Sequence, residues 1–418
     1  MQIDRRGFLK LSLSSTVALG MGGMSRYVFG QQGGNQETLV VVFLRGGCDA
    51  LNFVAPVNDK NYIEARSSDL RIMDSGDHPG LPLQNGLSRE LDFRIHNGAG
   101  PFVDLYKSGK LSIVHATGLT NGTRSHFESQ DLIERGVASL DQVSHVNNGW
   151  LARYASFQGF GGAVPVVSAS NGIDASLLGE NRAVAVPDLQ GGYQIPGGAE
   201  SLKVLTRFYS VNGNPVSLAG ISALNNISLI DSRLPRLPDG KYAAYVPDHG
   251  AVYDGGGDLA RGLQSIARLI KMDVGLNVAC VDHGGWDTHE GQPGRFNNQV
   301  GQLVRNIAAF YNDMSNYENK LTVVIMSEFG RRLRSNKSQG TDHGHGGMMF
   351  LLGGRIRGGQ MYGQWPGLET EQLDRGVDLA VTTDYRTVLS EFLNLQHADA
   401  GQIFPDFDFS SKLGFRKT

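Results

Sequence analysis

The run Thr38–Leu44 places the strongest constraint on the fold, because every one of its residues is apolar or β-branched. Such a run, without alternating polar residues, is typical of a strand that is buried on both faces of a sheet. Amphipathic helices are predicted at 258–272 and 296–314. Further strands are predicted at 111–116, 164–168, 183–186, 276–281, 321–326 and 348–352. Strands that alternate with helices indicate an α/β fold, in which a mostly parallel central sheet carries helices on both faces.

Size and charge narrow the class of protein further. The chain has 418 residues, 40% of them hydrophobic, and a net charge of −3. This length is enough for one large α/β domain or two smaller ones, and the charge balance gives no sign of a nucleic-acid partner. Between about 190 and 255 a helix is predicted near 199–210, followed by loops rich in Pro and Asn. We interpret this region as an insertion or cap within a domain that spans 38–418.

Residues 1–30 are predicted to be an export signal and no part of the fold. They contain the pair Arg5-Arg6 and a weakly apolar stretch from Leu11 to about Met24. This order resembles a twin-arginine signal; an ordinary N-terminal helix or a membrane anchor is the alternative. The apolar stretch is too weak to span a bilayer. We therefore expect a periplasmic or secreted protein, exported by the twin-arginine route, with no stable membrane span after signal removal.

The chain has two cysteines, Cys48 and Cys280, and each ends or follows a predicted strand. In an exported protein the two could form a disulfide if their strands are adjacent. Two buried free thiols are the more common outcome. The sequence has no Cys-x-x-Cys pair of the kind that binds zinc or carries out redox chemistry.

Side chains that bind metals are concentrated in two short segments. The first follows a predicted strand and contains Asp282, His283, Asp287 and His289. The second lies about fifty residues later and contains Asp342, His343 and His345. Imidazole and carboxylate groups at short spacing suit a zinc- or manganese-type cation.

Asp49 and Glu328 also follow predicted strands. The carboxyl ends of parallel strands meet at one edge of a sheet, so these residues are expected to converge with the two segments. Taken singly, an Asp after a strand is more often a turn or helix cap, and a single His is more often an ordinary hydrogen-bonded residue. The convergence of several such side chains is what predicts a metal site.

Within the first segment, Asp287 and His289 form the strongest candidate pair of ligands. One of Asp282 and His283 is interpreted as a partner that orients a ligand. In an extended segment His343 and His345 would face the same side, and Asp342 would accept a hydrogen bond from one of them. A turn before a helix is the alternative for Asp287, and a glycine-rich surface loop is the alternative for the second segment.

The segment Arg124-Ser125-His126 is the candidate nucleophile region, because it reads as the start of a helix. A hydroxyl at a helix N-terminus beside a cation could attack phosphorus or sulfur. The alternative is that Ser125 only caps the helix, since Ser125 and Glu128 fit the capping-box pattern. Arg124, Arg331 and Arg332 could bind a substrate oxyanion through paired hydrogen bonds, with an ordinary surface charge as the alternative for Arg332.

Several motifs occur in an order that resembles a known family. They are the twin-arginine start, Arg45-Gly-Gly-Cys-Asp49-Ala-Leu-Asn52, Arg124-Ser-His-Phe-Glu128, Gly285-Trp-Asp-Thr-His289, Ser327-Glu-Phe-Gly-Arg331 and Asp342-His-Gly-His-Gly-Gly347. Together they resemble the exported bacterial proteins grouped as domain-of-unknown-function family 1501 (DUF1501). That family is similar in layout to the alkaline phosphatase and sulfatase superfamily. The resemblance implies an alkaline-phosphatase-like three-layer sandwich with one or two divalent ions (zinc, manganese or calcium).

The resemblance also implies roles for individual positions. Asp49 matches the carboxylate ligand after the first strand, and Asp287 and His289 look like the Asp and His of one metal site. Glu328 stands where the superfamily has an Asp that is followed by His. Phe329 replaces that His, which removes one ligand of a second ion. Late in the chain, His343 or His345 resembles the last histidine ligand.

The nucleophile is less clearly matched than the metal ligands. Ser125 matches it best, with Thr123 as the alternative and His126 beside it as a further catalytic candidate. The Cys/Ser-x-Pro-x-Arg signature that sulfatases need for a formylglycine is absent from the sequence.

The sequence therefore predicts an exported metal-dependent hydrolase that acts on a small anionic phosphate or sulfate ester. The metal ligands are expected among Asp49, Asp282, His283, Asp287, His289, Glu328, His343 and His345. The alternative is a binding or assembly protein on the same fold, which keeps a cation but has no turnover. A third possibility is hydrolysis by an activated water, with no protein nucleophile.

Overall fold

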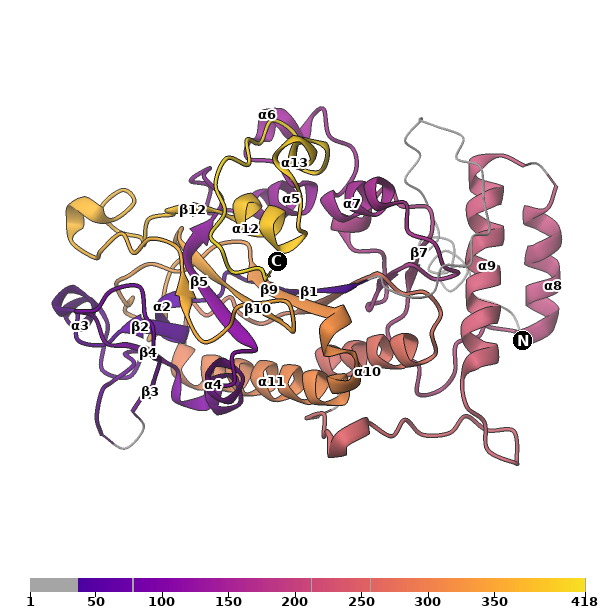
Figure 1. Cartoon of the computed structure of the whole chain (residues 1–418), viewed down its shortest axis with the longest axis horizontal. Helices are drawn as coiled ribbons and strands as arrows, with labels where there is room; N and C mark the ends of the chain where they lie inside the picture. The colour runs from indigo at the N-terminus through magenta and orange to yellow at the C-terminus, as the bar shows by residue number, and fades with distance from the viewer. Residues whose placement is uncertain (1–36, 77–78, 212, 256, 418) are drawn as a thin grey trace.

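A nine-stranded sheet forms the centre of the computed structural model, which describes residues 37–76, 79–211, 213–255 and 257–417 (Figure 1). Along the sheet the order is β11 (Met361–Tyr362), β5 (Leu111–Gly118), β10 (Gly347–Gly353), β9 (Leu321–Ser327), β1 (Thr38–Leu44), β8 (Val278–His283), β6 (Val166–Ser168) and β7 (Ala183–Ala185). The last strand, β12 (Thr383–Asp384), pairs with β5. The predicted export signal lies outside the described residues.

The sheet is parallel except for one strand. β10 runs antiparallel to both of its neighbours, β5 and β9. The pairs of β1 with β8 and β9, of β6 with β7 and β8, and of β5 with β11 and β12 are parallel. The prediction of a mostly parallel sheet is therefore confirmed. Because β10 is reversed, it starts at the same edge of the sheet where β8 and β9 end.

β1 is the central strand that its composition predicts. It pairs with β8 on one side and β9 on the other, so Val41 lies between Cys280 and Val324. Its side chains alternate between two apolar cores. Val40 and Val42 belong to one core and Val41 and Phe43 to the other. All residues of β1 are buried, as expected for a strand that is covered on both faces.

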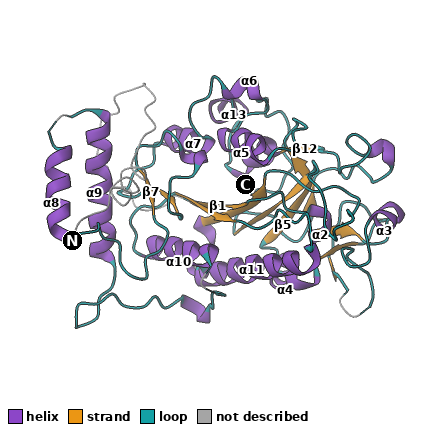
Figure 2. Cartoon of the chain, turned by 180° about the vertical axis from the view of Figure 1, so that it is seen from behind, coloured by secondary structure: helices purple, strands orange, loops and turns teal. Residues whose placement is uncertain are grey.

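Helices cover both faces of the sheet and complete a three-layer arrangement (Figures 1 and 2). One face carries α4 (Gly100–Lys107), α10 (Asp258–Lys271) and α11 (Gln292–Asp313). The other face carries α5 (His126–Arg135), α6 (Leu140–Val143), α7 (Trp150–Gln158), α12 (Tyr385–Phe392) and α13 (His397–Ile403). In α10 the predicted apolar stripe, which includes Leu259, Leu263 and Ile266, is buried against the sheet.

A second, smaller sheet follows β1. It is antiparallel, in the order β2 (Val54–Pro56), β4 (Phe93–Ile95) and β3 (Leu81–Pro82). The short helices α2 (Ala50–Phe53) and α3 (Lys60–Ala65) lie in the same part of the chain. Strands of two or three residues are too short to produce a periodic pattern, so the sequence did not indicate this sheet.

The region 190–255 is more helical than its sequence suggested. α8 (Gly198–Tyr209) matches the predicted helix. The predicted Pro- and Asn-rich loops are wrong over α9 (Pro215–Arg233), which is a long helix. Asn214 caps α9, because its side chain accepts a hydrogen bond from Ser217 N at 2.9 Å. Pro215 stands in the first turn, where its missing N–H costs no hydrogen bond, so both residues start a helix here. The α8–α9 hairpin stands beside β7 at one end of the sheet (Figures 1 and 2).

Both cysteines are free and buried. Cys48 belongs to the core on the α10–α11 face, whereas Cys280 belongs to the core on the α5–α7 face. The sheet separates the two side chains, which explains why they are not paired. Among the described residues, no helix combines the length and apolar character that crossing a bilayer requires.

Candidate metal centre

Loops at one edge of the sheet bring the predicted metal-binding side chains together. Asp287 and His289 lie in the loop between β8 and α11. His343 lies shortly before β10, whose reversed direction places its start at this edge. His126 joins them as the first residue of α5. The convergence therefore follows from the sheet topology and from the position where α5 begins.

Side chains along the loop after β8 alternate between buried and exposed positions. Trp286 and Thr288 are fully buried, whereas the side chains of Asp287 and His289 are 48% and 43% exposed. Gly46 makes the close packing of this loop possible. A Cβ at Gly46, whose φ is +120°, would lie 2.5 Å from Asp287 N, so any larger residue would push the loop away.

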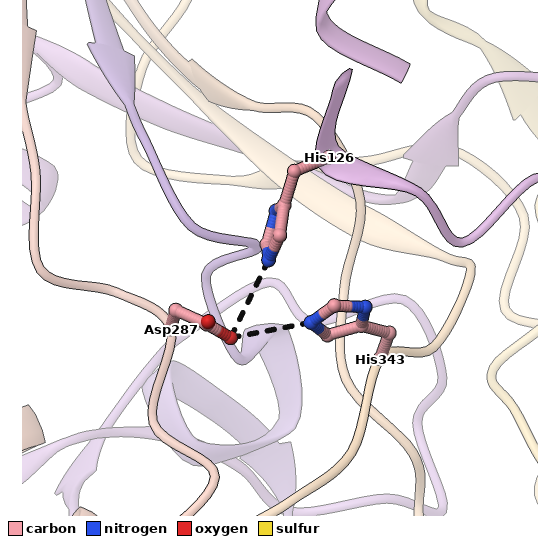
Figure 3. Close-up of side chains that lie close together, drawn as sticks. All are labelled: His126, Asp287 and His343. Atoms are coloured by element: carbon pink, nitrogen blue, oxygen red, sulfur yellow. Dashed lines mark hydrogen bonds and ion pairs between the residues drawn. The ribbon is translucent and has the colours of Figure 1, made fainter. Parts of the chain in front are cut away.

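Four atoms that can bind a metal point toward one another at this edge. Asp287 Oδ1 lies 3.4 Å from His126 Nε2, 3.1 Å from His289 Nε2 and 3.2 Å from His343 Nε2. The facing Nε2 atoms of His289 and His343 are 2.9 Å apart. Figure 3 shows His126, Asp287 and His343, whose ligand atoms all lie within 4.8 Å of one another.

The hydrogen bonds of the three histidines determine which nitrogen is free. Nδ1 of His343 lies 2.8 Å from the carbonyl oxygen of Arg124. Nδ1 of His126 lies 2.8 Å from Glu328 Oε1, and Nδ1 of His289 lies 3.2 Å from Asp342 Oδ1. Carbonyl and carboxylate oxygens accept hydrogen bonds, so each Nδ1 donates. In a neutral imidazole the opposite nitrogen, Nε2, then carries a lone pair.

Three Nε2 lone pairs therefore lie around one carboxylate oxygen, Asp287 Oδ1. Lone pairs of His289 and His343 at 2.9 Å repel each other unless a proton or a cation lies between them. His126 Nε2 is buried and has no hydrogen-bond partner. Histidines whose Nδ1 donates to an oxygen while Nε2 stays free are the usual arrangement around bound zinc. The residues present thus fit a divalent cation.

Asp287 is held in its ionised form by a buried arginine. Burial alone would raise the pKa of Asp287, but the hydrogen bond and charge of Arg331 outweigh it and lower the pKa to about 2. Arg331 is 1% exposed and also donates to the carbonyl oxygens of Gly46, Gly47 and Thr341. Arg331 therefore fixes the loops around the centre. The prediction that it binds a substrate oxyanion is wrong, because its guanidinium is already fully paired.

Glu328 lies behind His126 and does not point into the cluster. Its Oε1 accepts hydrogen bonds from Gly46 N at 2.9 Å and from Gln130 Nε2 and His126 Nδ1 at 2.8 Å. Burial would raise the pKa of Glu328, but these hydrogen bonds lower it. In turn, the hydrogen bond to Glu328 raises the pKa of His126. The structure thus places Glu328 as a support for one imidazole.

Asp49 is fully occupied by other partners. Its oxygens accept hydrogen bonds from Arg66 at 2.5 and 2.8 Å and from Gln292 at 2.7 Å. Asp49 also caps α2 by accepting from Asn52 N. Burial would raise the pKa of Asp49, but the charge of Arg66 lowers it. Asp49 therefore forms a buried ion pair with Arg66 and is tied to the start of α11 through Gln292.

Three further predicted ligands point elsewhere. Asp282 accepts from Arg45 Nε at 3.0 Å. His283 is buried beside Trp286, with ring centroids 5.5 Å apart, and burial lowers its pKa to about 4. His345 donates to Leu119 O from Nε2 at 2.8 Å. The expectation that His343 and His345 face the same side is wrong, because the chain bends at His345 before β10 starts.

The candidate nucleophile stands between two residues that contact the cluster. Ser125 precedes His126 and follows Arg124, whose carbonyl accepts from His343. The side chain of Ser125 caps α5, accepting from Glu128 N at 3.5 Å. The guanidinium of Arg124 donates to Asp378 at 2.7 Å and to Asp374 at 2.9 Å, so it is already paired.

The sequence missed His126 as a possible ligand, since its position at a helix start gave no sign of which way the ring points.

A family model agrees with the resemblance that the motifs suggest. Residues 256–400 match the DUF1501 family. The model describes this family as a protein of unknown function. The match includes Asp287, His289 and His343, whereas His126 lies before it. No curated protein shows significant similarity to the chain.

Solved structures with weak similarity to the chain include proteins described as alkaline phosphatases or members of their superfamily. One is a protein in the alkaline phosphatase superfamily from Vibrio parahaemolyticus, with 12% identity and a TM-score of 0.34, covering 86% of this chain and 71% of that chain. Another is the periplasmic domain of EcEptC from Escherichia coli in complex with Zn, with 8% identity, a TM-score of 0.34 and coverage of 77% and 73%. A third is alkaline phosphatase from the Antarctic bacterium TAB5, with 7% identity, a TM-score of 0.29 and coverage of 77% and 93%. Likeness at this level carries no argument about the chemistry of the DUF1501 segment.

Proposed function

We propose that the protein is a metal-dependent hydrolase of phosphate or sulfate esters, with one divalent cation held by His126, Asp287, His289 and His343. The observation that carries this proposal is the convergence of three free imidazole nitrogens on one ionised carboxylate oxygen. The motif order that resembles the alkaline phosphatase and sulfatase superfamily supports the choice of ester substrates.

The donor set favours one type of cation. Three nitrogens and one oxygen suit zinc, and also manganese, whereas calcium takes oxygen ligands. Glu328 and Asp342, which accept from His126 and His289, would keep these rings oriented toward the cation. Asp49 and Glu328 are left out of the proposed ligand set because their oxygens already accept several hydrogen bonds.

The centre is open enough to admit a substrate. The side chains of His126 and His343 are 22% and 24% exposed, and those of Asp287 and His289 are more exposed. A zinc-type cation at this position would act as a Lewis acid toward an ester oxygen. Arg331 holds Asp287 as a carboxylate, so the cation would meet a negatively charged ligand.

Ser125 remains the candidate nucleophile, because both of its chain neighbours contact the cluster. Its hydroxyl would have to leave Glu128 N, to which it is held by a long hydrogen bond of 3.5 Å. Hydrolysis by water needs no such movement. Ser125→Ala separates the two cases: activity would be lost if Ser125 attacks the ester and would survive if water attacks it.

Metal content tests the proposed centre directly. Elemental analysis of the purified protein is expected to find zinc or manganese at one equivalent. Asp287→Asn and His343→Gln are expected to lose the metal, whereas His145→Gln, at an exposed histidine, is expected to retain it. A protein that takes up neither metal, or variants that bind it like the wild type, would rule out the centre.

Activity is tested separately on a panel of aryl phosphates and aryl sulfates in the presence of each metal. Turnover that requires the metal and disappears in Asp287→Asn would support the hydrolase. A stoichiometric metal without turnover on any ester would instead support the alternative, a binding or assembly protein on the same fold.

A further inference from the structure

One face of α5 connects the candidate metal centre to a group of charged residues behind it. His126, Gln130 and Glu134 are spaced four residues apart, so they lie one above the other on the same side of the helix. His126 Nδ1 and Gln130 Nε2 both lie 2.8 Å from Glu328 Oε1. Gln130 Oε1 accepts from Arg45 Nη1 at 3.3 Å, and Glu134 accepts from Arg45 Nη2 at 2.6 Å. Gln130 therefore joins Glu328 to Arg45.

The side-chain amide of Gln130 has one favourable orientation at this position. A carboxylate oxygen accepts hydrogen bonds and a guanidinium donates them. The NH₂ group of Gln130 must therefore face Glu328, and its oxygen must face Arg45. A flipped amide would place its oxygen against Glu328 Oε1 and its NH₂ group against the guanidinium. Arg45 thus determines which group Gln130 offers to Glu328.

Three carboxylates hold Arg45 in place. Nη2 donates to Glu134 and, at 3.0 Å, to Asp174, while Nε donates to Asp282 at 3.0 Å. These carboxylates come from α5, from the loop after β6 and from β8. The guanidinium also lies 4.2 Å from the centre of the Phe43 ring. Hydrogen-bonded networks in which every member has a partner are rigid, so Arg45 is a fixed point for Gln130.

Glu328 is held in turn from two directions. Gly46 N donates to its Oε1 at 2.9 Å from the loop after β1, and Gln130 donates to the same oxygen from α5. Together these donors set the direction of the carboxylate that accepts from His126 Nδ1. Because the carboxylate is fixed, the His126 ring is fixed as well, with Nε2 3.4 Å from Asp287 Oδ1.

We propose that Gln130 and Arg45 are positioning residues of the metal centre, which act on the His126 ring through Glu328. Gln130 keeps Glu328 beside His126, and Arg45 keeps the amide of Gln130 in the orientation that donates. Neither residue is itself a ligand. The inference rests on the proposed function, because it takes His126 as a ligand of the cation.

The metal affinity of Gln130→Met provides the first test. Methionine keeps the length of the side chain but offers Glu328 no N–H group. Competition with a chromophoric chelator is expected to show zinc binding that is weaker by about three- to tenfold, as for the loss of one hydrogen bond. The matched control is Gln264→Met on α10, where the amide contacts Gln190 at 3.5 Å. This control is expected to bind zinc like the wild type.

A double-mutant cycle shows whether Gln130 acts through the His126 ring. In the His126→Gln background the ring is absent, so Gln130→Met is expected to cause no further loss of zinc affinity. A merely structural role would lower the affinity by the same factor in both backgrounds. That result, or equal affinities of Gln130→Met and Gln264→Met, would overturn the inference.

Arg45→Lys tests whether Arg45 acts through Gln130. Lysine keeps the positive charge among the three carboxylates, but it lacks the planar fork that also reaches Gln130. Zinc binding is expected to weaken when Gln130 is present and to stay unchanged when Gln130→Met has already been introduced. An equal loss in both backgrounds would show that the assignment of Arg45 is wrong.

The metal-free chain separates failure of this inference from failure of the proposed function. Proton–nitrogen correlation spectra of the histidine rings at alkaline pH show which nitrogen carries the proton. In the wild type His126 is expected to be protonated on Nδ1, and Gln130→Met is expected to add a population that is protonated on Nε2. A wild type that binds no zinc but shows this difference would refute the metal centre and support the positioning of the ring by Gln130. Identical His126 spectra in the two chains would overturn the inference, whatever the metal content.

Discussion

Glu328→Gln tests whether His126 binds the cation and whether Glu328 acts through it. The substitution keeps the shape of the side chain and removes its charge. Oε1 of the amide still accepts from Gly46 N, His126 Nδ1 and Gln130 Nε2. The new NH₂ group replaces Oε2 and faces Ser327 Oγ, which can accept because its own proton reaches Leu44 O at 2.6 Å. The fold is therefore expected to tolerate the change.

The expected loss lies in metal affinity. Carboxylates that accept a hydrogen bond from a histidine ligand increase its basicity, and removing such a partner costs about 10- to 100-fold in affinity. This corresponds to about 1.4–2.7 kcal/mol of binding free energy. Glu328→Ala is the contrasting variant. It leaves three buried donors without an acceptor, at about 1–3 kcal/mol each, so it lowers the stability of the fold as well.

The loss should also depend on pH. The hydrogen bond to Glu328 raises the pKa of His126, so a proton competes with the cation at that nitrogen more strongly in the wild type. In Glu328→Gln the pKa falls and this competition weakens. The affinity ratio between wild type and variant is therefore expected to be largest at alkaline pH and to shrink as pH falls.

Competition with a chromophoric chelator measures the affinity at each pH, and urea unfolding measures the stability. Glu290→Gln is the matched control, because it removes an exposed negative charge beside His289 that has no contact with the proposed ligands. An affinity for Glu328→Gln that equals that of Glu290→Gln at every pH would refute the reasoning. So would a loss of affinity that grows at acid pH.

Three further predictions concern stability and activity. Asp49→Asn leaves the buried charge of Arg66 without its partner, so urea unfolding is expected to show a free energy of unfolding lower by about 3–5 kcal/mol. The metal content is expected to stay at the wild-type level. Loss of the metal would instead show that Asp49 is a ligand. Burial, together with the charge of Asp174, raises the pKa of Glu134 from 4.5 to about 7. The folded chain then binds the proton more tightly, and the stability present below pH 4.5 is lost as pH rises through about 7. Glu134→Gln removes that loss, because the amide carries no charge at any pH. Its free energy of unfolding is expected to exceed that of the wild type by up to about 3 kcal/mol at about pH 8 and to equal it at about pH 4. Equal stability of the two proteins at both pH values would contradict this. Ser125→Ala removes the cap of α5 and is expected to cost about 1 kcal/mol in thermal or urea unfolding, whatever its effect on turnover; a variant as stable as the wild type would show that the cap contributes nothing.

The sequence predicted the sheet better than the site, for a physical reason. A strand buried on both faces must be apolar throughout, so Thr38–Leu44 and Leu321–Ser327 were recognisable from composition alone. The start of α9 was misread because Asn214 and Pro215 occur both in loops and at helix N-termini. Which of the two applies depends on the apolar residues that follow and on the core they meet.

The site residues depended on contacts that no local pattern contains. Asp49 follows a strand just as a ligand would, but its oxygens are occupied by Arg66, seventeen residues later, and by Gln292, which is distant in the chain. His126 was expected to assist catalysis, and its ring turns out to lie beside Asp287 because α5 begins at that point. Sequence spacing predicted that Asp287, His289 and His343 meet, since strand ends at one edge converge whatever the loops contain.

Phe329 bears on how many cations the centre holds. In the superfamily that the motifs resemble, a histidine occupies this position and serves a second ion. Here the Phe329 ring stacks on His126, with centroids 4.9 Å apart, and lies 5.0 Å from the ring of His343. It offers no lone pair, and it packs against two imidazoles, so it restricts the directions in which their Nε2 atoms can point. Glu328, the neighbouring carboxylate, is turned away toward Gly46 and Gln130. A second ion would thus lack both the histidine and the carboxylate at this position. The first ion would find four ligands already converging. This difference favours chemistry at a single cation.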